Sequence, residues 1–196
     1  MLNMNILIWN CWGALNPTFK NVVIDLVQLH SLAIMIVTET KVGDNRAKEI
    51  TSQLPFDGAI ISSTIGLTGG FWLLWDSSRV EIAKLSYTEH EIHVTISCSH
   101  TQPWLLSTVC ANPRYAEQRL LWENLFTVAS FHSFPWVIAG DFNEVLLGED
   151  KFGGRNVNIN RALKFQECLN NCKMIDIGFS SPRYTLSNLR PLSQLI

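Results

Sequence analysis

The sequence predicts an α/β fold in which two packed sheets have helices outside them. Three observations lead to this prediction. Several short runs are wholly apolar, which is typical of buried strands, and one run alternates between apolar and polar residues, which is typical of a strand with one covered face. Between these runs, apolar residues recur at helical spacing, and stacked layers of sheets and helices cover both kinds of element.

The first half of the chain supplies most of the predicted strands. Asn16 and Pro17 form an N-cap and first-turn pair that opens a helix continuing to about His30, and a weaker helix over 45–54 ends before Pro55. We expect strands at 5–9, 32–37, 59–62, 70–75, 80–85 and 91–98, the last one alternating and therefore half-buried.

The second half alternates strands with longer helices. Strands are expected at 104–110 and 136–139, and helices at 115–131 and 160–172. The apolar stripes of the two helices consist of Leu121, Trp122, Leu125, Phe126 and Ala129, and of Ala162, Phe165, Leu169 and Cys172. No repeat or low-complexity linker interrupts the pattern, so we expect one domain over residues 1–196.

Composition excludes several classes of protein. The 196 residues are 47% hydrophobic and 16% charged, which excludes a disordered or fibrous chain. A net charge of −2 argues against a bulk nucleic-acid binder, although residues 151–196 carry 7 basic and 2 acidic groups, a net of +5. The five cysteines contain no CxxC pair, and neither a secretory signal nor a membrane span is evident. We therefore expect an intracellular protein, nuclear or cytoplasmic, that is not secreted, binds no membrane and is a monomer.

Three apolar strands are each followed by a carboxylate or amide side chain. Asn10 follows the first strand, Glu39 follows the second, and Asp141 and Asn143 follow the strand near 136–139. If these strands are neighbours, the side chains meet at one rim, where ligands collect in open α/β sheets. Carboxylate oxygens suit Mg²⁺, so Glu39 is the candidate metal ligand, and Asp141 could orient or deprotonate a water molecule. Asn10 and Asn143 can bind a carboxylate, a metal or a phosphate oxygen without adding charge.

The same residues belong to an ordered set of short motifs. These are Trp9–Gly13, Thr38–Lys41, Gly69–Trp75, Arg119–Trp122, Gly140–Val145, Lys151–Gly154, Asp176–Phe179 and Tyr184–Asn188. In order and spacing the set resembles the endonuclease/exonuclease/phosphatase superfamily, and in particular the endonuclease domain of plant LINE-type (non-LTR) retrotransposons. The resemblance runs from about residue 4 to about residue 190.

The resemblance implies a DNase I-like, four-layer α/β sandwich that hydrolyses phosphodiester bonds in DNA with Mg²⁺, or with Mn²⁺ in its place. By this resemblance Glu39 binds the metal and Asn10 helps to hold the carboxylates around it. Asp141 positions or activates the nucleophile, and Asn143 contacts the scissile phosphate. Asn188 and Arg155 are further candidates for substrate contact. The rest of a retrotransposon polyprotein is an expected partner.

The sequence departs from the family pattern in three places. Cys110 stands where the family has a tyrosine that supports the phosphate, and Leu186 stands where it has an aromatic residue. The residues from Pro191 to Ile196 do not resemble the family's Ser-Asp-His segment, whose Asp and His complete the site. We therefore expect a domain that is incomplete at its C-terminus, lacks its last strand or strands, and has weak or absent activity.

The sequence leaves two other functions open. The first is a non-catalytic retrotransposon remnant that binds DNA or a protein partner, and the second is a small-molecule phosphatase of the same superfamily. His90, His93 and His100 are close in sequence, but His93 falls on the polar face of an alternating strand. We therefore expect surface histidines there and no zinc site.

Overall fold

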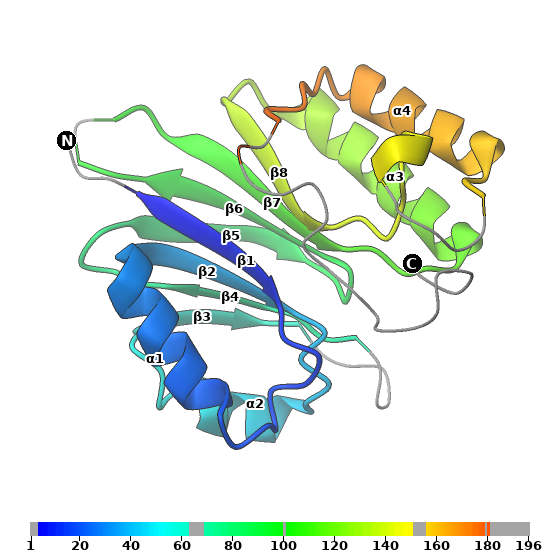
Figure 1. The fold of residues 1–196 in the computed structure, drawn as a ribbon. Coiled ribbons are helices and arrows are strands. Elements are labelled where there is room, and N and C mark those ends of the chain that lie inside the picture. Colours follow the sequence, from blue (N-terminus) through cyan, green and yellow to red (C-terminus); the bar gives the residue numbers. More distant parts are fainter. Residues whose placement is uncertain (1–3, 63–68, 100, 151–155, 179, 181–196) are drawn as a thin grey trace. The chain divides into compact units, whose positions relative to one another are not determined.

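The computed structural model describes residues 4–62, 69–99, 101–150, 156–178 and 180. Figure 1 shows their strands and helices. The chain divides into two compact units. The first unit comprises Met1–Ala111 and Ser133–Phe142, and the second comprises Asn112–His132 and Asn143–Ile196. The predicted single domain over residues 1–196 stays a prediction.

The observed elements agree closely with the predicted ones. In chain order they are β1 (Asn5–Asn10), α1 (Phe19–His30), β2 (Leu32–Thr38), α2 (Asp44–Thr51), β3 (Gly58–Ile61), β4 (Trp72–Trp75), β5 (Glu81–Tyr87), β6 (Glu91–Ser97), β7 (Trp104–Cys110), α3 (Tyr115–Phe131), β8 (Trp136–Asp141) and α4 (Ile159–Asn171). A short 3₁₀ helix at Gly148–Asp150 was not predicted.

The first unit contains two four-stranded sheets, ordered β1-β2-β4-β3 and β5-β6-β7-β8. In each sheet one pair is parallel, β1 with β2 and β7 with β8, and the remaining pairs are antiparallel. The strands of each parallel pair are joined by a crossover helix, α1 between β1 and β2 and α3 between β7 and β8. Parallel neighbours require such a crossover connection. The predicted pair of packed mixed sheets is therefore confirmed.

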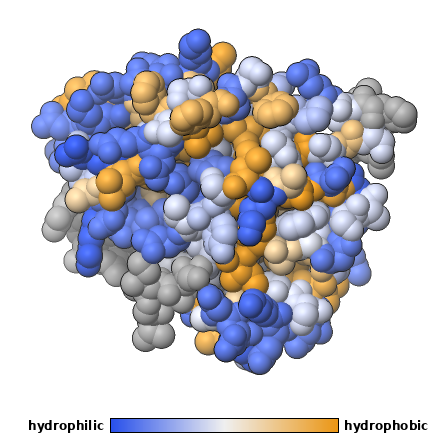
Figure 2. All heavy atoms as spheres, turned by 180° about the vertical axis from the view of Figure 1, so that it is seen from behind, coloured by the Kyte–Doolittle hydropathy of each residue, from blue (hydrophilic) through white to orange (hydrophobic). Residues whose placement is uncertain are grey.

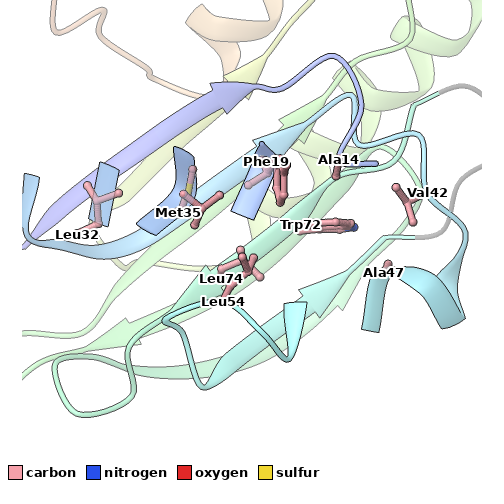
Figure 3. Packing of buried hydrophobic residues seen from close by; sticks show 11 residues of the cluster. Ala14, Phe19, Leu32, Met35, Val42, Ala47, Leu54, Trp72 and Leu74 are labelled. Carbon is pink, nitrogen blue, oxygen red and sulfur yellow. The ribbon is translucent and has the colours of Figure 1, made fainter. Parts of the chain in front are cut away.

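One hydrophobic cluster lies between the two sheets. It includes Ile34 and Ile36 of β2, Leu73 of β4, and Ile92 and Val94 of β6. A second cluster covers the other face of the first sheet (Figure 3), where α1 and α2 pack against Met35, Trp72 and Leu74. Because β2 is covered on both faces, all seven of its residues are buried, which explains its uninterrupted apolar sequence.

Aromatic rings fix the start of α1 on the first sheet. The ring of Phe19 stacks on Trp9 of β1, with centroids 5.4 Å apart and planes 9° apart. The same ring meets Trp72 of β4 edge-on, at 5.9 Å and 88°. Such pairs add about 0.5–1.5 kcal/mol beyond the burial of their area. They anchor the segment after β1, which carries part of the candidate site.

The second unit is built on the pair of helices α3 and α4. Trp122 of α3 stacks on Phe165 of α4, with ring centroids 4.8 Å apart. The predicted α4 stripe is buried at Ala162, Phe165 and Cys172, whereas in α3 the prediction fails at Phe126, which is 54% exposed. The buried positions of α3 are Gln118, Leu121, Trp122 and Leu125, so its covered stripe begins one turn earlier and includes a polar residue.

The expectation that His93 is a surface residue is wrong. Glu91 and His93 of β6 are only 3% and 4% exposed. His93 Nδ1 lies 2.7 Å from Ser107 Oγ, and Nε2 lies 3.2 Å from Glu91 Oε2. Ser107 Oγ also accepts a hydrogen bond from Trp136 Nε1 at 2.8 Å. Polar side chains can be buried when they are paired in this way. The alternation in β6 predicts which residues share a face, but it does not show whether the polar face is covered by other residues.

Hydrophobic side chains also reach the surface in places, as Figure 2 shows for one face of the molecule. Trp12, Leu29 and Phe131 are among the exposed ones. Single exposed apolar residues are ordinary in soluble proteins, so each needs an explanation only where its surroundings suggest one. Within the described residues, no helix is both long and apolar enough to cross a membrane.

Candidate active site

The ends of β1 and β2 bring Asn10 and Glu39 to the same rim of the first sheet. The two strands are parallel and pair Asn10 with Thr38, so Glu39 is the first residue beyond the paired region. Two backbone hydrogen bonds continue the pairing into the loops that follow. Cys11 N–H donates to Thr38 O at 3.1 Å, and Ala14 N–H donates to Thr40 O at 2.8 Å. The loops 10–14 and 38–41 are therefore fixed to each other.

The end of β8 brings Asp141 to the corresponding rim of the second sheet. Asp141 pairs with Cys110 of β7, and its carbonyl oxygen accepts a hydrogen bond from Ala111 N–H at 2.7 Å. Gly140 before it has a φ of 144°, and a Cβ there would lie 1.9 Å from Val109 O. Only glycine permits this close approach between β7 and β8. The Gly-Asp order in the sequence thus has a steric cause.

Asn10 and Asp141 meet where the two sheets pack. β8 contacts both β1 and β2, and Asn10 Nδ2 lies 3.5 Å from Asp141 Oδ2. That distance is at the long end for a hydrogen bond. Asn10 Oδ1 accepts a hydrogen bond from Trp12 N–H at 3.3 Å, which orients the amide so that its NH₂ group faces the carboxylate.

Glu39 and Cys110 complete the surroundings of this pair. The Glu39 side chain is 30% exposed, and Lys41 Nζ lies 3.5 Å from its Oε2. Burial raises the pKa of the Cys110 thiol to about 12, and the negative charges of Asp141 and Glu39 act in the same direction. Both carboxylates therefore lie near one buried thiol that stays protonated at neutral pH. Cys110 brings a neutral side chain to the place where the family has a phenol.

The oxygen donors of Asn10, Glu39 and Asp141 fit a hard divalent cation. Among the described residues no three His, Cys, Asp or Glu side chains gather into a metal-binding cluster, so a zinc-type cage is absent from that part of the chain. Mg²⁺ keeps several water ligands and is usually held by one or two carboxylates together with substrate phosphates. Glu39 and Asp141 supply two carboxylates, and Asn10 supplies one amide oxygen.

Asn143 belongs to the second unit, where side chains hold its loop. Its φ is 46°, and its carbonyl oxygen accepts a hydrogen bond from Gln118 Nε2 at 3.0 Å. Gln118 Oε1 accepts in turn from Arg161 Nη2 at 2.9 Å, and Arg161 Nε donates to Glu144 Oε2 at 2.7 Å. Gln118 is fully buried, and the Glu144 side chain is 8% exposed. We call Gln118, Asn143, Glu144 and Arg161 the Asn143 network.

The structure thus brings Asn10, Glu39 and Asp141 together in the first unit and describes Asn143 in the second. The candidate substrate contacts Arg155 and Asn188 lie outside the described residues, as does Leu186. Sequence reasoning missed Gln118 and counted Arg161 only among the basic residues of 151–196. A polar residue three positions before Leu121, in line with the apolar stripe of α3, was the available signal for Gln118.

Comparison with known proteins assigns the chain to a family. A model of the Endonuclease/Exonuclease/phosphatase family matches residues 7–158, which include Asn10, Glu39, Asp141 and Asn143. By sequence alone, the chain matches no curated protein.

Solved structures share the fold at low sequence identity. An AP endonuclease, LMAP from Leishmania major, is 13% identical over 84% of this chain with a TM-score of 0.64, and the chain spans 65% of that enzyme. The endonuclease domain of TRAS1, a telomere-specific non-LTR retrotransposon, is 13% identical over 87% of this chain and 71% of that one, with a TM-score of 0.61. The 3′ phosphatase NExo from Neisseria, bound to a product DNA hairpin, is 15% identical over 86% of this chain and 71% of that one, with a TM-score of 0.63.

Proposed function

The chain belongs to the endonuclease/exonuclease/phosphatase family, and from this premise we propose that it is a Mg²⁺-dependent DNA endonuclease of the retrotransposon type. The observation that carries the proposal is the meeting of Asn10 and Asp141 at 3.5 Å, with Glu39 on the adjoining strand end. This arrangement would supply two carboxylates and an amide where the ends of β1, β2 and β8 meet, the donor set that metal-assisted phosphoryl chemistry needs.

In the proposed reaction, water attacks the phosphorus atom and the bond to the leaving oxygen of the sugar breaks. Asp141 accepts the proton of the attacking water at its carboxylate, as a general base. Asn10 holds that carboxylate in orientation through its NH₂ group. Asn143 donates a hydrogen bond to a phosphate oxygen, and the Asn143 network fixes the loop that carries it.

Glu39, with the amide oxygen of Asn10, would hold the divalent cation. When bound, Mg²⁺, or Mn²⁺ in its place, stabilises the negative charge that develops on the phosphoryl oxygens. Lys41 Nζ at 3.5 Å from Glu39 Oε2 limits the freedom of that carboxylate, although an exposed pair of this kind contributes little to stability.

Motif order supports the retrotransposon type more than a small-molecule phosphatase. The run Lys151–Gly154 is typical of LINE-type endonucleases, and the fold is shared with the TRAS1 endonuclease domain. The proposed substrate is DNA, and the proposed partner is the remainder of a retrotransposon polyprotein.

A plasmid-nicking assay tests the function. With supercoiled plasmid and Mg²⁺, we expect the wild type to produce open circles, and Glu39→Ala and Asp141→Ala to lower the rate by about 10²–10⁴-fold each. Glu49→Ala is the matched control, because Glu49 is a 59%-exposed carboxylate paired with Arg46 on α2. Nicking that survives Asp141→Ala, or that is absent from the wild type with both Mg²⁺ and Mn²⁺, would reject the proposal.

A further inference from the structure

Trp12 holds a large aromatic ring in solvent directly beside the candidate site. It is 59% exposed, although burial of an indole is ordinarily favourable. Trp12 follows Asn10 by two residues, and its backbone N–H donates to Asn10 Oδ1 at 3.3 Å. The exposed ring is therefore tied through the backbone to a residue of the candidate site.

The backbone around Trp12 is fixed in an uncommon conformation. Trp12, Glu39 and Lys41 have φ values of 54°, 57° and 56°. Such left-handed conformations are rare for bulky residues and persist only where neighbouring structure enforces them. Here the two hydrogen bonds that join loops 10–14 and 38–41 enforce them, together with a bond from Lys41 N–H to Gly69 O at 2.9 Å. Trp12 is thus displayed by a rigid loop pair.

A cation accompanies the ring. Lys41 Nζ lies 5.8 Å from the centroid of the Trp12 ring, within the range of a cation–π contact. The Lys41 side chain is 40% exposed, and its ammonium group is also 3.5 Å from Glu39 Oε2. A positive charge and an exposed aromatic face therefore occur side by side. The same ammonium group also pairs with Glu39, the candidate metal ligand.

We propose that Trp12 and Lys41 form a binding site for an unpaired nucleobase of DNA, a proposal that rests on the proposed function. The base stacks on the indole, and the adjoining phosphate lies near the ammonium group. Every base has a π face, so stacking of this kind tolerates any sequence, while a lysine near the backbone adds an electrostatic contribution. The preferred substrate is therefore DNA with an unpaired nucleotide beside the cleaved bond, in place of fully paired duplex.

Binding without cleavage tests this site. We would measure the affinity of a fluorescein-labelled single-stranded oligonucleotide by fluorescence anisotropy in EDTA, where no hydrolysis occurs. Trp12→Ala should weaken binding by about 5- to 150-fold, the range for loss of one stacked base, and Trp12→Phe should retain most of the affinity. The preference of the wild type for single-stranded over duplex oligonucleotide should shrink in Trp12→Ala.

Salt dependence separates the ring from the charge. Lys41→Met should lower the magnitude of the slope of log affinity against log salt by about 0.7, whereas Trp12→Ala should leave that slope unchanged. Tyr87→Ala is the matched control, because Tyr87 is 48% exposed on β5 with Lys84 Nζ 4.7 Å from its ring centroid. That variant should bind like the wild type.

Several results would overturn the site. They are equal affinity of Trp12→Ala and the wild type, an equal loss in Tyr87→Ala, and no binding of DNA by the wild type. Because binding is measured without hydrolysis, the two proposals fail separately. Trp12-dependent binding without nicking rejects the hydrolysis alone, and nicking with Trp12-independent binding rejects the stacking site alone.

Discussion

Asp141 and Asn143 are two residues apart in the chain and are fixed in two different ways. Asp141 ends a strand, and backbone pairing with β7 holds it through the register to Cys110 and the bond from Ala111 N–H. Asn143 is held from the second unit by side chains, through Gln118 and Arg161. A backbone ladder depends on few side-chain identities, whereas a side-chain network depends on every one of its members.

The difference shows which substitutions would displace each residue. On the Asp141 side, the backbone position is lost only by a change that separates β8 from β7, and Gly140 is the position where one added carbon would do so. On the Asn143 side, truncation of Gln118 or Arg161 removes a hydrogen bond from a buried polar group, which costs about 1–3 kcal/mol. Substitutions on the two sides therefore test the comparison directly.

The largest effect is expected from Gly140→Ala. The new Cβ would meet Val109 O at 1.9 Å and would impose a φ of 144° on an alanine. We expect a loss of roughly 3 kcal/mol or more in the free energy of unfolding, and nicking reduced by about 100-fold or more. Urea unfolding and the nicking assay measure both quantities.

Gly148→Ala is the matched control for this substitution. Nothing lies within 4 Å of a Cβ built at Gly148, and its φ is not in the left-handed range. It should change stability by less than about 0.5 kcal/mol. Equal behaviour of the two alanine variants would mean that the close approach of β7 and β8 does not position Asp141.

A smaller effect is expected from Arg161→Ala. It removes the donor to Gln118 and leaves the Glu144 carboxylate buried without this partner. We expect a loss of about 1–3 kcal/mol in stability and a fall of about 10- to 100-fold in nicking, because the loop of Asn143 loses its fixed position. Arg161→Lys should recover only part of the activity, since lysine lacks the planar fork that reaches both partners.

Lys164→Ala serves as the control on the same helix. Lys164 pairs with Glu167 at 2.7 Å, but both side chains are more than half exposed. Such a pair contributes under about 1 kcal/mol, so stability and nicking should hardly change. If Arg161→Ala behaved like Lys164→Ala, the Asn143 network would be dispensable.

The smallest effect concerns alkaline stability and Cys110. Its pKa is about 12 in the folded protein against an ordinary 9.0, because burial and the nearby carboxylates disfavour the thiolate. A raised pKa gives stability that is fully present below pH 9.0 and is lost as the pH rises towards 12. The slope should approach about 1.4 kcal/mol per pH unit from this group.

Urea unfolding of the wild type and of Cys110→Ser at several pH values measures this contribution. The gap in stability between the two proteins should narrow as the pH rises above 9.0, because serine does not titrate there. A gap that stays constant with pH would show that the pKa of Cys110 is not raised by burial and by the nearby carboxylates in solution.

The sequence predicted most of the fold because its strands are apolar and short and its helices have clear stripes. It also indicated that Asn10, Glu39 and Asp141 each lie directly after an apolar strand. Only β1 and β2 of those strands are neighbours in one sheet, because β8 lies in the second sheet. The sequence could not predict the Asn143 network, because Gln118 and Arg161 take their roles only from tertiary packing. Burial of Glu91 and His93 escaped prediction for the same reason, since a covered polar face has the same alternation as a solvated one.

The pairing of Asn10 with Asp141 also has a consequence for how the protein is made. The two residues are 131 positions apart, and each lies at the end of a parallel pair closed by a crossover helix. Contacts of such long range form late, because the entropy of closing a large loop must be overcome first. During synthesis the first sheet can therefore collapse on α1 and α2 well before β8 leaves the ribosome. We expect the nascent chain to have a hydrophobic core before it has an active site.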